Sequence, residues 1–100
     1  MDTTQPIVVH VSGRVTRDDI PRLCAELIRR LADAPATEAI YDVGALAPAD
    51  LAAVDALARL RLTARRRGCR LHLRSATPEL LALLALVGLA ETPAGLIETE

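Results

Sequence analysis

The sequence has no phenylalanine or tryptophan and a single tyrosine, so its core cannot be built around aromatic rings. Hydrophobic residues still make up 51% of the 100 residues, enough for one core of leucine, valine, isoleucine and alanine. A chain of this length is too short for two such cores. We therefore expect one domain over residues 1–100.

Cysteine is scarce, and its spacing fits neither a metal site nor a disulfide framework. Cys24 and Cys69 lie far apart and form no CxxC motif, so we interpret both as buried thiols in a reducing cytoplasm. We expect no metal site and no cofactor. Lysine is absent, and the formal net charge of −1 argues against a nucleic-acid-binding protein that relies on a strongly basic field.

Long apolar runs are missing as well. No segment reaches the roughly 18 apolar residues of a membrane span. Residues 1–6 (MDTTQP) have neither the charged nor the apolar region of a signal peptide. These features predict a cytoplasmic protein without a membrane span.

Strand patterns and helix patterns alternate along the chain. Short apolar or alternating segments predict strands at residues 7–12, 38–44 and 69–75. Helical periodicity follows each of them, at residues 16–35, 48–67 and 76–88, and residues 95–99 are a candidate edge strand. This order predicts an α/β fold, with a small, largely parallel or mixed sheet of about four strands and three to four α-helices.

Side chains suited to capping precede each predicted helix. Asp18 or Asp19 can cap the first helix, Asp50 the second and Thr77 the third. Asp55 follows in the first turn of the second helix, where its charge suits the positive end of the helix dipole.

Glycines predict where two of the helices end. Gly68 follows three arginines and Gly88 follows a leucine-rich helix, so each is expected to stop its helix. The third helix is apolar nearly all round, so we expect the sheet to cover one side and another surface the opposite side. A homodimer through this helix is one way to cover it.

Four segments occur together in the order and spacing of STAS domains, the fold of bacterial anti-sigma factor antagonists. The chain resembles this family over about residues 7–91. The matching segments are residues 10–27 (HVSGRVTRDDIPRLCAEL), 39–50 (AIYDVGALAPAD), 57–73 (LARLRLTARRRGCRLHL) and 77–91 (TPELLALLALVGLAE). The strand that usually precedes residues 7–12 in the family is expected to be shortened or missing.

The resemblance implies a non-enzymatic regulatory module that binds a kinase-like anti-sigma factor. In the family, that kinase phosphorylates a serine in an Asp-Ser-Ser-Gly loop, and the modified antagonist is released. Asp50 matches the aspartate, whereas Leu51, Ala52 and Ala53 stand at the two serines and the glycine. Ala52 occupies the phosphorylated position and has no hydroxyl. The expected module therefore binds its partner without the usual serine phosphoswitch.

The resemblance also indicates the contact surface, formed by two loops. Leu51 is either an exposed apolar anchor for a partner or a residue folded back against the strand. Thr16 stands where the family usually has an aspartate and is a weaker candidate phosphoacceptor. The expected contact residues are Thr16, Arg17, Asp18, Asp50, Leu51, Ala52 and Asp55.

Other functions stay open at this point. Some STAS modules are accessory subunits of transporter ATPase complexes, including lipid-transport complexes, and small-ligand binding is a third alternative. The sequence has no Ser-His-Asp order, paired-carboxylate signal or glycine-rich phosphate loop, so we predict that it is not an enzyme. His10 and His72 lie on predicted strands, where we expect structural roles.

Overall fold

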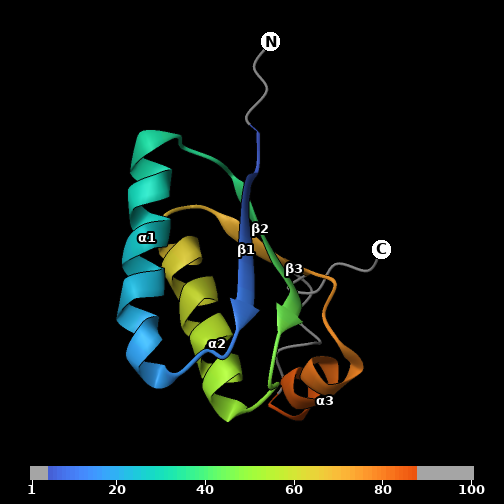
Figure 1. Ribbon diagram of the computed structural model, residues 1–100. Helices are drawn as coiled ribbons and strands as arrows, with labels where there is room; N and C mark the ends of the chain where they lie inside the picture. The colour runs from blue at the N-terminus through green and yellow to red at the C-terminus, as the bar shows by residue number, and fades with distance from the viewer. Residues whose placement is uncertain (1–4, 88–100) are drawn as a thin grey trace.

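Strands and helices alternate along the chain as the periodicity predicts. The computed structural model describes residues 5–87. Its elements, shown in Figure 1, are β1 (Ile7–Gly13), a 3₁₀ turn η1 (Arg17–Asp19), α1 (Ile20–Asp33), β2 (Glu38–Leu46), α2 (Leu51–Arg66), β3 (Arg70–Arg74) and α3 (Pro78–Leu86). The predicted first helix is thus divided into a short 3₁₀ turn and an α-helix.

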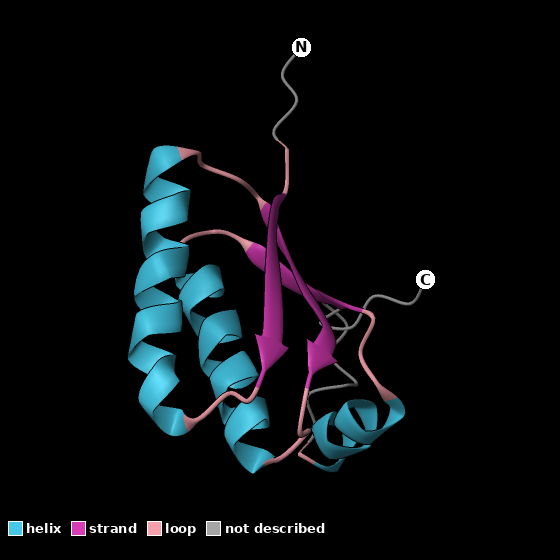
Figure 2. Cartoon of the chain, viewed as in Figure 1, coloured by secondary structure: helices cyan, strands magenta, loops and turns pink. Residues whose placement is uncertain are grey.

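The three strands form one parallel sheet in the order β1-β2-β3. A helix connects each strand to the next, and such crossovers place consecutive strands parallel. In Figure 2, α1 and α2 lie side by side on one face of the sheet. The predicted α/β fold is confirmed. The described sheet has three strands where about four were expected, and the candidate strand at 95–99 lies outside the described residues, as does Gly88.

The core lies between the sheet and these two helices. Alternate residues of β2, Ala39, Tyr41 and Val43, point into it, and Tyr41 is only 2% exposed. Burial raises the pKa of the Tyr41 hydroxyl far above its ordinary value. The other large buried side chains are aliphatic, as predicted: Leu27, Leu57, Leu60, Leu73, Leu80 and Leu84.

Two of the predicted caps are confirmed. The Asp50 carboxylate accepts a hydrogen bond from the Ala53 N–H at 3.0 Å, and the Thr77 hydroxyl accepts one from the Leu80 N–H at 3.3 Å. Because Asp50 is the cap, α2 begins three residues after the predicted Pro48.

The capping hydrogen bond predicted for the first helix is not formed, so this prediction is wrong. Asp19 precedes α1, but its carboxylate makes no capping hydrogen bond to a backbone N–H of that helix. It turns back instead and accepts hydrogen bonds from the Thr16 N–H at 2.9 Å and from the Thr16 hydroxyl at 3.1 Å. This carboxylate therefore closes the η1 turn.

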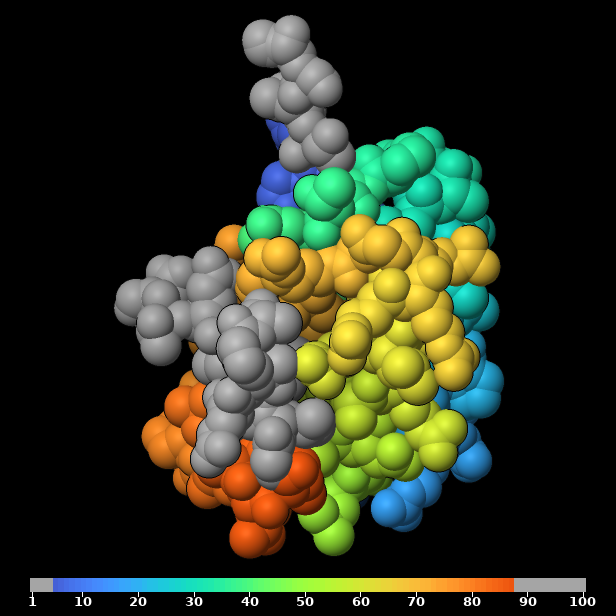
Figure 3. All heavy atoms as spheres, turned by 180° about the vertical axis from the view of Figure 1, so that it is seen from behind, coloured from blue at the N-terminus to red at the C-terminus, as the bar shows by residue number. Residues whose placement is uncertain are grey.

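The third helix, α3, lies beside the start of α2, as the views from opposite sides in Figures 1 and 3 show. It buries Leu80 and Leu84 against the core, whereas Leu86 is 77% exposed at its end. Among residues 5–87, no helix has the length and apolar character needed to cross a membrane.

The cysteines differ in their surroundings. Cys69 is buried as predicted, and burial raises the pKa of its thiol, while Cys24 is half-buried on α1. Both are free thiols.

Candidate functional site

The two loops of the expected contact surface lie next to each other in the structure. η1 packs against α2, although Arg17 and Asp55 are 38 residues apart in the sequence. The Arg17 Nε lies 3.4 Å from an Asp55 carboxylate oxygen and forms an ion pair with it. We call the seven predicted contact residues (Thr16, Arg17, Asp18, Asp50, Leu51, Ala52 and Asp55) the α2 N-terminal surface.

Asp50 fixes the start of α2. Its side chain binds the Ala53 N–H, and its carbonyl accepts the Val54 N–H at 3.1 Å, which is the first backbone bond of the helix. Such a cap stabilises a helix by about 1 kcal/mol. Ala53, at the position of the family's glycine, is fully buried. The cap and the buried Ala53 side chain therefore both anchor the start of α2.

Leu51 and Ala52 follow the cap in the first turn. Leu51 is 56% exposed, so it does not fold back against the strand, and that alternative is wrong. Ala52 is half-buried and lies at the surface. Together they place apolar groups where the family carries hydroxyl groups.

Asp55 lies beyond the first turn of α2, where it was predicted to interact with the helix dipole, and its partners are two arginines. It accepts a hydrogen bond from the Arg59 Nε at 3.1 Å in addition to its ion pair with Arg17. The hydrogen bond from Arg59, and then the charges of both arginines, hold the pKa of the Asp55 carboxyl below its ordinary value. Our sequence analysis missed Arg59, although the four-residue spacing from Asp55 is the signal for such a pair.

The η1 side of the surface is ordered by a second acidic residue. Asp19 holds Thr16 through two hydrogen bonds and also accepts one from Arg22 at 3.2 Å. The bond from the Thr16 backbone is the main cause that lowers the pKa of the Asp19 carboxyl. Asp18, which stands between Arg17 and Asp19 in η1, is exposed.

The histidines lie on the other face of the sheet from α1 and α2. The His10 Nδ1 is 3.7 Å from an Asp42 carboxylate oxygen, and the His72 Nε2 is 3.9 Å from one of Glu38. Within the described part of the chain, no three histidine, cysteine or acidic side chains come together in an arrangement that could hold a metal ion.

A parallel sheet covered on one face by two helices, with a capped loop at the start of the second helix, is consistent with a STAS-like fold. Comparison with protein families agrees, since residues 2–98 match the family described as "Mlab, STAS domain". The chain belongs to the STAS domain family. No curated protein matches it.

Proposed function

We propose that this STAS domain is a non-enzymatic, cytoplasmic regulatory module that binds a kinase-like anti-sigma factor through its α2 N-terminal surface. The observation that carries the proposal is the exposure of Leu51 in the first turn of α2. An exposed leucine loses contact with water when a partner covers it, which stabilises the complex by roughly 1.5–3 kcal/mol.

Charged groups surround this leucine and are held in place before binding. Asp55 is fixed between Arg17 and Arg59, and Asp50 is fixed by its hydrogen bond to α2. An apolar centre with a polar rim is the usual organisation of a protein–protein interface. Because the rim is already ordered, little side-chain entropy is lost on binding.

Ala52 makes this binding constitutive. A phosphate at this position would add roughly 1.5–2 negative charges at a helix N-terminus and change the surface that the partner must match. Alanine has no hydroxyl to accept it, so the kinase of an anti-sigma factor has no means of releasing the module at residue 52.

The test is to incubate the purified chain with a serine-kinase anti-sigma factor and ATP, and to measure binding and phosphate incorporation. We expect a complex that persists with ATP and no phosphate on either loop. The Ala52→Ser variant should accept phosphate and then dissociate. Leu51→Ala should weaken binding roughly tenfold or more, while Leu62→Ala, at a leucine 47% exposed further along α2, should not. Phosphate on residues 16–18 or 50–55 of the natural chain would refute the proposal.

An accessory subunit of a lipid-transport ATPase complex is the second candidate. A subunit of a stable complex needs a permanent docking surface, and a surface without a phosphoacceptor at residue 52 suits it. The matching family is also described as Mlab and not as an anti-sigma factor antagonist. Co-purification with a co-expressed transporter ATPase, again lost in Leu51→Ala, would favour this candidate.

A further inference from the structure

The outer edge of β1 is open in the part of the chain that the structure describes. Among residues 5–87, β1 lies at the end of the sheet and pairs with β2 alone. A sheet edge presents unpaired N–H and C=O groups, which another extended chain can bind. This edge is separate from the α2 N-terminal surface and from the function proposed for it.

Backbone hydrogen bonds show which β1 residues face outward. The Val8 carbonyl accepts a hydrogen bond from the Arg30 Nη1 of α1 at 3.3 Å, so it points away from β2. The Gly13 carbonyl accepts the Ala47 N–H at 3.1 Å on the β2 side. The backbone N–H and C=O groups of successive strand residues point to opposite edges of the strand. The Val8 and Gly13 carbonyls therefore show which residues of β1 point to which edge. His10 and Ser12 therefore direct their N–H and C=O groups outward.

The strand itself is regular along this edge. Between the pairs His10–Asp42 and Ser12–Ala45, β2 contains one residue more than β1, so the irregularity in the ladder belongs to β2. β1 can consequently accept a regular added strand.

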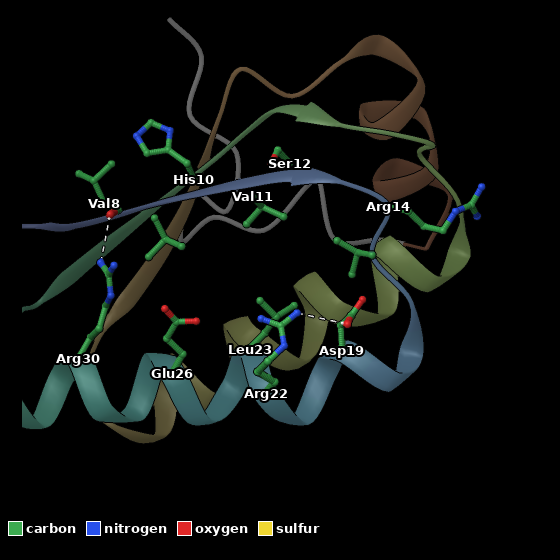
Figure 4. A pocket seen from close by; sticks show the side chains of 12 residues that line it. Val8, His10, Val11, Ser12, Arg14, Asp19, Arg22, Leu23, Glu26 and Arg30 are labelled. Atoms are coloured by element: carbon green, nitrogen blue, oxygen red, sulfur yellow. Dashed lines mark hydrogen bonds and ion pairs between the residues drawn. The ribbon is translucent and has the colours of Figure 1, made fainter.

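A groove of about 450 Å³ runs beside this edge, between β1 and α1. Figure 4 shows β1 along one side of the groove, and Arg22, Glu26 and Arg30 reaching toward it from α1. Leu23 and Val9, both half-buried, give the groove an apolar floor. Its lining follows β1 from Val8 to Ser12, which is the course that an added strand would take, and continues past the end of the strand to Arg14 and Val15.

The charge of the groove favours an acidic occupant. Three arginines line it, Arg14, Arg22 and Arg30, against two acidic residues, Asp19 and Glu26. Asp19 and Arg22 already bind each other, whereas among residues 5–87 the hydrogen bond of Arg30 goes to the Val8 carbonyl and to no carboxylate. A second copy of this chain, paired through the same edge, would bring two sets of these arginines together. The charge therefore disfavours self-association here.

We propose that the β1 edge and this groove bind an extended segment of a partner protein as a fourth, edge-added strand, in which apolar residues alternate with acidic ones. The apolar side chains would cover Val9 and Leu23. The carboxylates would pair with Arg22 and Arg30. Main-chain hydrogen bonds would engage His10 and Ser12.

The test uses an acetylated and amidated peptide of alternating valine and glutamate, added to the full chain at neutral pH, with NMR amide hydrogen exchange as the readout. In the free chain we expect fast exchange at His10 and Ser12 and slow exchange at Val9 and Val11, which face β2. The peptide should slow exchange at the outward-facing amides of His10 and Ser12 and leave exchange at Val9 and Val11 unchanged. A valine–lysine peptide should not slow exchange at these amides, and neither should a valine–glutamate peptide N-methylated at every residue.

Arg30→Gln should weaken peptide binding about threefold, as expected for one exposed ion pair. Arg29→Gln is the matched control, because Arg29 is exposed on the same turn of α1 but does not line the groove. Equal binding of the lysine peptide, protection at α2 instead of β1, or no binding would overturn the proposal. Concentration-dependent protection of His10 and Ser12 without peptide would also overturn it, in favour of a second copy.

Discussion

Replacing Asp50 by alanine removes the side chain that begins α2. The bond lost is the one from the Ala53 N–H to the carboxylate, 3.0 Å long and half-buried. Loss of an N-cap of this kind lowers the free energy of unfolding by about 1 kcal/mol, within a range of roughly 0.5–2 kcal/mol. For a domain of about 100 residues, 1 kcal/mol lowers Tm by roughly 4–8 °C. Urea denaturation followed by circular dichroism measures the change.

Two control variants separate the cap from the charge. Asp50→Asn keeps an oxygen acceptor without the charge, so it should stay within a few tenths of a kcal/mol of the natural chain. Asp18→Ala removes a carboxylate from an exposed position within η1 and should have little effect. If Asp50→Ala is as stable as the natural chain, or Asp18→Ala loses as much, the cap does not hold α2 in the way argued above.

Three further predictions concern the core, a helix end and pH. Leu57→Ala should cost about 2–5 kcal/mol in chemical denaturation, because Leu57 is only 2% exposed, whereas exposed Leu62→Ala should cost far less. Gly68→Ala should cost about 1 kcal/mol by the same measurement, since φ at Gly68 is +74° and no neighbouring atom would meet the new methyl group. The lowered pKa of Asp55, caused first by Arg59, stabilises the fold above the unfolded pKa near 3.8, and this contribution is lost as the pH falls through the lower folded pKa. Asp55→Asn should therefore lose less stability than the natural chain between about pH 6 and about pH 3, and an identical acid profile would contradict the assignment.

The order of strands and helices could be predicted because it is encoded locally. Apolar residues recur with period two in β3 and with helical spacing in α1, and such patterns depend only on neighbouring residues. The caps at Asp50 and Thr77 are equally local, since donor and acceptor lie three residues apart. The cap at Asp19 was mispredicted because the first turn of α1 and the η1 turn compete for the same carboxylate. The carboxylate binds the Thr16 N–H, which closes η1, and does not cap α1.

The sequence by itself determined the α/β order, the aliphatic core and the absence of a hydroxyl at Ala52. Only the tertiary structure decided that Arg17 reaches Asp55, that Leu51 stays exposed, and that within residues 5–87 the outer edge of β1 is unpaired beside Arg30. Each of these depends on how α1 and α2 pack across the sheet. Residue patterns specify which face of an element is apolar, but the contacts between distant segments are fixed only when those faces are buried together.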